Sequence, residues 1–130
     1  MLTGGCFCGQ VRYEVSGTPL GEICHCSICR CTTGAPMVGW FTVRPSEFRL
    51  TAGTLTQFRS TAPVERGFCP TCGTQITFRD DRADDLAVTT ASLDDPEAVP
   101  PRDHIWTASR LSWVKLADGL PEHPHARSTH

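Results

Sequence analysis

Alternating apolar and polar residues predict short β-strands along most of the chain. Val11, Tyr13 and Val15 alternate with charged residues, a period of two that is typical of a strand with one buried face. Residues 74–79 repeat the alternation, with Ile76 on the apolar face. The same reasoning predicts further strands over residues 36–43, 47–50, 54–59, 86–91 and 111–116.

Turn residues separate these strands at short intervals, which favours an all-β sandwich or barrel-like fold with little helix. The Ala52-Gly53 pair predicts a hairpin between the strand before it and the strand after it. A long amphipathic helix is not predicted, and short helical turns are expected to begin at Thr33 and within residues 93–99.

The composition narrows the class of protein further. The chain has 130 residues, the size of one domain, and its 39% hydrophobic and 20% charged residues are typical of a folded chain. The sequence contains no apolar run near the roughly 18 residues that a membrane helix needs. A net charge of −2 gives no basic surplus for nucleic acid, so we expect neither a nucleic-acid nor a membrane partner.

Eight cysteines are the unusual feature of the composition. The first residues show neither the basic nor the apolar segment of a secretory signal, so we expect a cytoplasmic protein. Structural disulfides are rare in the reducing cytosol, which favours metal binding as the reason for so many cysteines. They fall into three groups: Cys6 and Cys8; Cys24, Cys26, Cys29 and Cys31; and Cys69 and Cys72.

The spacing within these groups is typical of zinc ligands. Residues 69–73 form a C-x-x-C-G sequence, in which both sulfurs can face one ion about 2.3 Å away and Gly73 can adopt the positive φ that closes the turn. The Cys6-Phe7-Cys8 pair can chelate if the backbone bends. Four thiolates close a structural zinc site, whereas three leave one position open. Both a four-plus-four and a four-plus-three division remain possible from spacing alone.

Four motifs containing these cysteines or aromatic residues follow one another along the chain. They are Gly4-Gly5-Cys6-Phe7-Cys8-Gly9, Cys24-His25-Cys26-Ser27-Ile28-Cys29-Arg30, Arg66-Gly67-Phe68-Cys69-Pro70-Thr71-Cys72-Gly73, and His104-Ile105-Trp106 with Asp118-Gly119-Leu120-Pro121. In this combination the chain, from about Gly4 to Pro124, resembles the glutathione-dependent formaldehyde-activating enzyme family, also called the centromere protein V family.

The resemblance implies an all-β fold called the β-tent, in which short antiparallel sheets are pinned by zinc knuckles. It also implies two zinc ions per chain. The structural zinc would be held by Cys6, Cys8, Cys69 and Cys72, and a second, catalytic zinc with an open position by Cys24, Cys26 and Cys29. A single domain would span residues 1–124, with a flexible tail at 125–130, and segment 119–130 is expected to be frayed.

The resemblance implies a function as well. Glutathione or a similar thiol would bind at the open zinc and form or lose an S-hydroxymethyl adduct with formaldehyde, which is carbon–sulfur lyase chemistry. Arg30 could pair with a carboxylate of the thiol or neutralise the anionic cluster, and His25 is expected at the surface or as a proton shuttle. Cys31 departs from the family pattern and would close the second site if it bound there. The alternative function is a non-catalytic, zinc-stabilised binding module.

Overall fold

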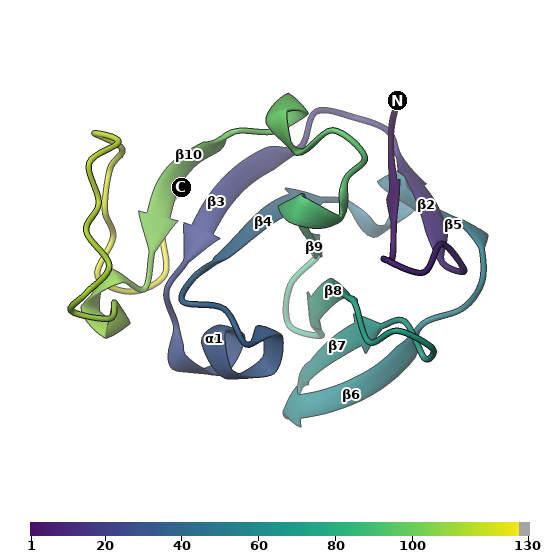
Figure 1. Ribbon diagram of the computed structural model, residues 1–130, viewed down its shortest axis with the longest axis horizontal. Helices are drawn as coiled ribbons and strands as arrows, with labels where there is room; N and C mark the ends of the chain where they lie inside the picture. Colours follow the sequence, from purple (N-terminus) through teal and green to yellow (C-terminus); the bar gives the residue numbers. More distant parts are fainter. Residues whose placement is uncertain (128–130) are drawn as a thin grey trace.

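The computed structural model describes residues 1–127, which form two β-sheets and one α-helix (Figure 1). The strands are β1 (Leu2–Gly5), β2 (Arg12–Val15), β3 (Leu20–Cys24), β4 (Val38–Val43), β5 (Phe48–Ala52), β6 (Thr56–Thr61), β7 (Val64–Phe68), β8 (Gln75–Asp80), β9 (Leu86–Thr89) and β10 (Pro101–Ile105). The α-helix is α1 (Ser27–Thr33), and the 3-10 helices are η1 (Pro45–Glu47), η2 (Thr90–Ser92), η3 (Pro96–Ala98) and η4 (Thr107–Ser109). The predicted all-β class is confirmed. In this part of the chain no helix is both long and apolar enough to cross a membrane.

The two sheets differ in size. Strands β1, β2 and β5 form an antiparallel sheet of three, and the other seven form a second sheet in the order β10-β3-β4-β9-β8-β7-β6. Neither sheet of the described residues closes into a barrel. Every pair of strands is antiparallel, as expected, except β10 with β3, which is parallel. The long connection that a parallel neighbour requires is supplied by the strands between β3 and β10.

The predicted hairpin at residues 52–53 and the predicted strand at residues 111–116 are wrong. The chain does not form a hairpin at Ala52-Gly53, because β5 pairs with β2 in the small sheet whereas β6 pairs with β7 in the large one. Gly53 has a φ of +74°, and the chain crosses between the sheets there. Residues 111–116 form a turn and an irregular segment rather than a strand, and Trp113 is exposed.

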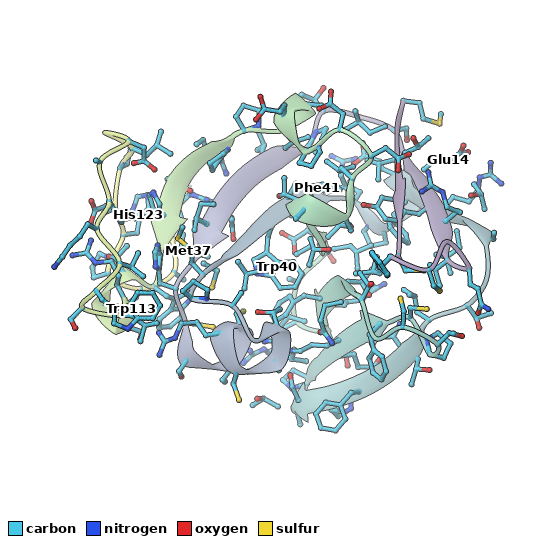
Figure 2. All side chains as sticks on the ribbon, viewed as in Figure 1. Glu14, Met37, Trp40, Phe41, Trp113 and His123 are labelled. Carbon is cyan, nitrogen blue, oxygen red and sulfur yellow. The ribbon has the colours of Figure 1, made fainter. Side chains whose placement is uncertain are left out.

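Strand β4 is buried on both faces and separates two cores. Successive side chains of a strand point to opposite faces, so Trp40 and Phe41 enter different cores (Figure 2). Phe41 packs in the larger core, which contains Val11 and, from the small sheet, Tyr13 and Val15. The buried residues of the smaller core are Cys24, Cys29, Val38 and Trp40. The strand therefore brings an aromatic side chain directly against two cysteines.

Helix α1 connects β3 to β4 and is bounded by two local signals. Cys26 is the N-cap residue, and its Sγ accepts a hydrogen bond of 3.3 Å from the backbone N–H of Cys29. Gly34 ends the helix in the left-handed region, with a φ of +68°. The expected helical turn at Thr33 is wrong because α1 ends at that residue, whereas the turn expected within residues 93–99 is confirmed by η3.

The C-terminal segment runs along β10 (Figure 1). The backbone N–H of His123 donates to the carbonyl of His104, at 2.9 Å. Further along, Arg127 donates to both carboxylate oxygens of buried Asp103, each at 2.6 Å. These bonds cover the edge of β10 that does not face β3.

This arrangement corrects one expectation about the terminus. Segment 119–130 is not frayed as far as Arg127, because backbone and side-chain bonds hold it against β10. Residues 128–130, which belong to the predicted tail at 125–130, lie outside the described residues. The domain boundary at residue 124 stays a prediction.

Candidate functional site

Four cysteines meet where the two sheets approach each other. Cys6 and Cys8 follow β1 of the small sheet, whereas Cys69 and Cys72 lie between β7 and β8 of the large sheet. Their sulfur atoms all lie within 4.8 Å of one another. Cys6 and Cys69 are buried, and the other two are exposed. The structure thus brings together the four residues that the resemblance assigned to the structural site.

Tight turns orient these sulfurs toward one another. The N–H of Gly73 donates to the carbonyl of Cys69 at 2.9 Å, and the N–H of Gly9 donates to the carbonyl of Cys6 at 3.2 Å. Both glycines have positive φ angles, +81° and +82°, which confirms the expectation for Gly73. The N–H of Val11 also donates to Cys6 Sγ, at 3.2 Å. Donors of this kind stabilise a thiolate.

A second group consists of Cys24, Cys26 and Cys29, whose sulfur atoms also lie within 4.8 Å of one another. Cys24 ends β3, Cys26 caps α1 and Cys29 lies in the first turn of α1. Cys31 is exposed, because two further helical positions turn its side chain by about 200° relative to Cys29. Within residues 1–127, no fourth His, Cys, Asp or Glu joins this group.

The donor chemistry of both groups fits a thiophilic metal ion. Four sulfurs bound tetrahedrally at about 2.3 Å from one zinc ion stand about 3.8 Å apart. The sulfur of Cys8 lies 3.5 Å from that of Cys6 and 3.8 Å from that of Cys69, close to this spacing. Three thiols would leave one tetrahedral position without a protein ligand. Each group could therefore hold one metal ion.

Hydrogen bonds shift the pKa values of Cys24 and Cys26 in opposite directions, and in the four-cysteine group they lower the pKa of Cys72. The contact with Cys24 lowers the pKa of Cys26 to about 2, and the same contact raises the pKa of Cys24 above its usual range. The hydroxyl of Thr74, 3.2 Å from Cys72 Sγ, lowers the pKa of Cys72 to about 5. The lowered pKa values favour the thiolate form of Cys26 and of Cys72, which is the form that binds metal ions.

Arg66 is a candidate that the hydrophobic pattern did not single out. This residue of β7 is 3% exposed, and its Nη1 and Nη2 donate to Cys29 Sγ at 3.7 and 3.6 Å. Its guanidinium also lies over the ring of Phe78, 4.9 Å from the centroid. The spacing in the sequence could have identified Arg66. It lies two positions after Val64, and alternate residues of a strand face the same side, so both side chains point inward from β7.

A cavity of about 680 Å³ adjoins the second group of cysteines. All three of these cysteines line it, and Arg66 lies beside them. Trp40 and Phe78 supply an aromatic wall, with ring centroids 5.8 Å apart. Its volume lies within the range of small-molecule sites, and an apolar wall beside a few polar groups is typical of them.

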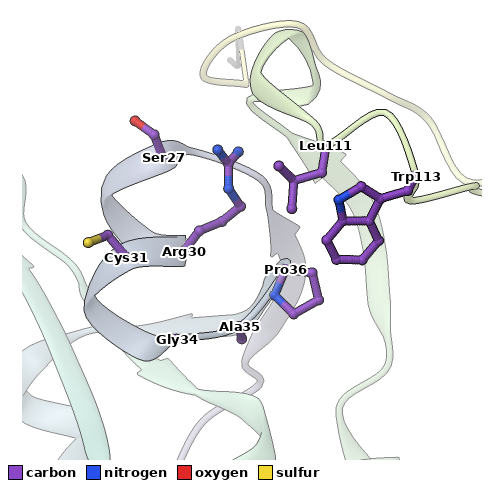
Figure 3. Close-up of a pocket in the computed structure, with 8 residues that line it drawn as sticks. All are labelled: Ser27, Arg30, Cys31, Gly34, Ala35, Pro36, Leu111 and Trp113. Atoms are coloured by element: carbon purple, nitrogen blue, oxygen red, sulfur yellow. The ribbon is translucent and has the colours of Figure 1, made fainter.

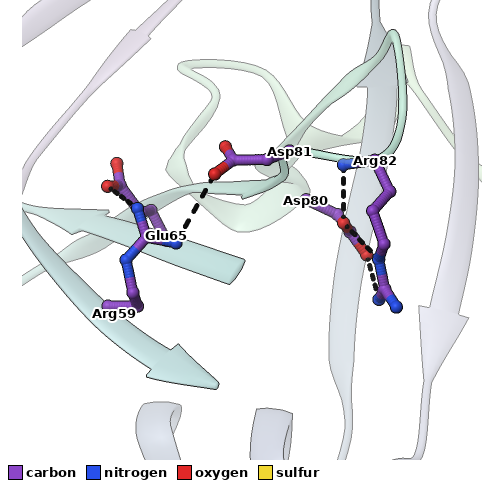
Figure 4. Close-up of polar contacts among 5 residues, drawn as sticks. All are labelled: Arg59, Glu65, Asp80, Asp81 and Arg82. Atoms are coloured by element: carbon purple, nitrogen blue, oxygen red, sulfur yellow. Dashed lines mark hydrogen bonds and ion pairs between the residues drawn. The ribbon is translucent and has the colours of Figure 1, made fainter. Parts of the chain in front are cut away.

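Paired charges border the same cavity. Arg82 donates to Asp80 at 2.8 Å (Figure 4), and this hydrogen bond lowers the pKa of Asp80 to about 2. Arg127 donates to Glu22 at 2.9 Å on the side formed by the C-terminal segment. A charged ligand would therefore meet both signs of charge around the cysteines.

Arg30 follows Cys29 in α1 but does not line the cavity beside the three cysteines. Its Nη1 donates to the carbonyl of His25 at 2.7 Å and to the carbonyl of Ser109. Together with Cys31 and Trp113 it lines a shallower cavity of about 400 Å³ (Figure 3). The cation in contact with the cysteine group is Arg66 rather than Arg30, and a role for Arg30 in binding a substrate carboxylate stays a prediction.

His25 is fully buried, so the expectation of a surface histidine is wrong. Its Nε2 lies 2.9 Å from Nδ1 of His104, whose Nε2 lies 2.8 Å from Asp118 Oδ2. Burial lowers the pKa of His25. This chain of polar groups joins the segment that carries Cys24 and Cys26 to β10 and the C-terminal segment.

These observations define a class: an all-β protein with two cysteine groups that could each hold a metal ion, one between its sheets and one beside a cavity. The family model described as glutathione-dependent formaldehyde-activating enzyme matches residues 1–109, and the chain belongs to this family.

Two individual proteins are similar to the chain. A protein from Halomonas elongata, which carries the provisional name glutathione-dependent formaldehyde-activating enzyme, is 30% identical over 134 aligned positions that cover 89% of this chain and 81% of that protein. A crystal structure of a Rhodobacter sphaeroides protein superimposes with a TM-score of 0.59 at 25% identity, covering 93% of this chain and 98% of the other.

Proposed function

We propose that this protein is a cytoplasmic, zinc-dependent carbon–sulfur lyase. Its substrates would be glutathione or a similar thiol together with formaldehyde, and the product an S-hydroxymethyl adduct. Family membership supports the thiol and the aldehyde. The single observation that carries the proposal is that Cys24, Cys26 and Cys29 converge beside a cavity with no fourth metal-binding side chain from residues 1–127.

The reaction itself is an addition. The thiol sulfur forms a bond to the aldehyde carbon, the carbonyl π-bond breaks, and the thiol proton ends on the new hydroxyl oxygen. Cleavage of the adduct reverses these changes. Bound at three thiolates, zinc would supply a Lewis acid that favours the thiolate form of an incoming thiol.

The residues of the chain would contribute binding and orientation. The cavity of about 680 Å³ is far larger than a one-carbon aldehyde needs, so its volume fits a thiol of small-peptide size. Trp40 and Phe78 would exclude water from one side of the reacting sulfur. Holding thiol and aldehyde together would supply the proximity that the uncatalysed addition lacks.

An exchange experiment tests this proposal. Formaldehyde labelled with ¹³C is mixed with glutathione, and NMR exchange spectroscopy measures how fast label moves between free aldehyde and adduct. The zinc-loaded protein should accelerate this exchange above the spontaneous rate, and Cys26→Ser should not. Equal rates with and without wild-type protein would contradict the lyase assignment and favour a non-catalytic binding module.

A further inference from the structure

We infer that Arg66 is a positioning residue that offsets the negative charge of the three-cysteine centre and so permits an anionic thiol to bind there. The inference deepens the proposed function and rests on it. Arg66 belongs to β7, whereas the three cysteines belong to β3, the cap of α1 and α1 itself, and all four residues line the same cavity.

The burial of Arg66 demands a partner of negative charge. Its hydrogen-bond partners within residues 1–127 are the hydroxyls of Ser60 and Thr32, at 2.9 and 3.2 Å, and the sulfur of Cys29. None of these is a carboxylate. Burying an unpaired guanidinium is strongly unfavourable because the charge loses its hydration, so its surroundings must supply the opposite charge. The cysteine group is the one neighbour among these contacts that can supply a full negative charge.

The charge balance of the centre explains why such a cation matters. One divalent ion and three thiolates carry a net charge of about −1, and a further thiolate would raise this to about −2. A buried charge of that size is strongly unfavourable in a low-dielectric cavity. Arg66 Nη2 lies 3.6 Å from Cys29 Sγ, so with a divalent ion bound the guanidinium would make the group as a whole neutral before an anionic ligand arrives.

The surroundings also fix the orientation of the guanidinium. Its Nε is held by Ser60, its Nη1 by Thr32, and its plane lies over the ring of Phe78 at 4.9 Å. These contacts direct both terminal nitrogens at the same sulfur. A guanidinium makes such a two-pronged contact and stacks on a ring, whereas an ammonium supplies only a point charge.

The experiment uses the full chain loaded with cobalt(II), whose absorption reports ligands bound at each centre. It compares the affinity of 2-mercaptoethanol, which binds as an anion, with that of neutral imidazole. Arg66→Gln should weaken the binding of 2-mercaptoethanol about 10- to 100-fold relative to the binding of imidazole. In the same variant a chelator should remove the metal ion of the three-cysteine centre about 10- to 100-fold more readily. The metal ion of the four-cysteine centre should be unaffected. Arg66→Lys, which keeps the charge but not the two-pronged contact, should recover part of the preference for the anion. Arg79→Gln on β8, an exposed arginine, is the matched control and should change nothing.

The outcomes separate this inference from the proposed function. If wild-type protein binds neither ligand, the open centre itself is refuted. If it binds 2-mercaptoethanol and both Arg66 variants change the two affinities equally, Arg66 only packs against the site and the inference is overturned. If Arg66→Gln fails to fold, Arg66→Met replaces it, because methionine keeps an apolar stem without the charge. The affinities of Arg66→Met and Arg66→Lys for 2-mercaptoethanol and imidazole are then compared. If both variants change the two affinities equally, the inference is overturned.

Discussion

The sulfur of Cys8 lies 3.8 Å from the sulfur of Cys69, although 61 positions separate the two residues along the chain. Cys8 belongs to the segment after β1, and Cys69 to the turn between β7 and β8, so this contact joins the small sheet to the large one. A metal ion bound here would close a loop of about 60 residues, and cross-links over long loops constrain the unfolded chain most in the entropy model.

Cys72→Ser should therefore unfold the protein. Structural zinc contributes on the order of 10 kcal/mol in model peptides, which is comparable to the whole stability of a typical domain. Circular dichroism and elemental analysis of the purified variant would measure the effect. A variant that keeps a cooperative unfolding transition after losing one metal would show that this centre does not hold the fold together.

Cys26→Ser should remove one metal ion and leave the fold intact. Serine is a preferred N-cap residue, so it can keep the cap of α1 that Cys26 Sγ makes with the N–H of Cys29. We expect about two zinc ions per chain in the wild type and about one in this variant, by elemental analysis. If Cys26→Ser unfolds as Cys72→Ser is expected to, the division into a structural and a catalytic centre is wrong.

Asp103→Asn should destabilise the protein in a pH-dependent way. Arg127 donates to both oxygens of this buried carboxylate, which lowers the pKa of Asp103, and losing the charge-assisted bonds should cost about 2 kcal/mol at pH 7. Because the folded pKa is lowered, this contribution is fully present above the unfolded pKa of about 4 and is lost as the pH falls through the folded pKa. Urea unfolding at pH 7 and pH 3 would measure the difference between wild type and variant. A difference of the same size at both pH values would contradict the ion pair.

Gly34→Ala should reduce stability by about 1 kcal/mol, because the φ of +68° is strained for a residue with a Cβ. An added Cβ would meet no atom within 4 Å, so backbone strain is the sole cost. Gly34→Asn is the matched control and should lose less, since asparagine tolerates the left-handed region. Thermal unfolding of both variants would compare them; equal stability of wild type and Gly34→Ala would show that the helix ends in another way.

The sequence predicted the strands whose burial follows the simple alternation of apolar residues. β2 is such a strand, with Tyr13 and Val15 buried. β10 could not be found in this way, because the side chains it buries are Asp103 and His104, whose partners come from distant segments. Helix α1 was missed because its seven residues bury only Cys29, so it shows no apolar stripe.

For the candidate site, the sequence predicted which cysteines belong together but not which other residues contact them. The cysteine motifs and the family resemblance identified the residues that the structure groups together. They could not reveal the partners of those residues, because a contact such as that between Arg66 and Cys29 joins positions 37 apart through the pairing of distant strands. The exposed position of Cys31 likewise depends on α1, which the sequence patterns did not predict.

The central claim is that the three-cysteine centre binds an external thiol. Isothermal titration calorimetry of the zinc-loaded full chain with glutathione tests it most directly. We predict about one glutathione bound per chain, with binding lost in Cys26→Ser. Absence of any binding to a protein shown to carry two zinc ions would contradict the claim and leave the metals with a structural role.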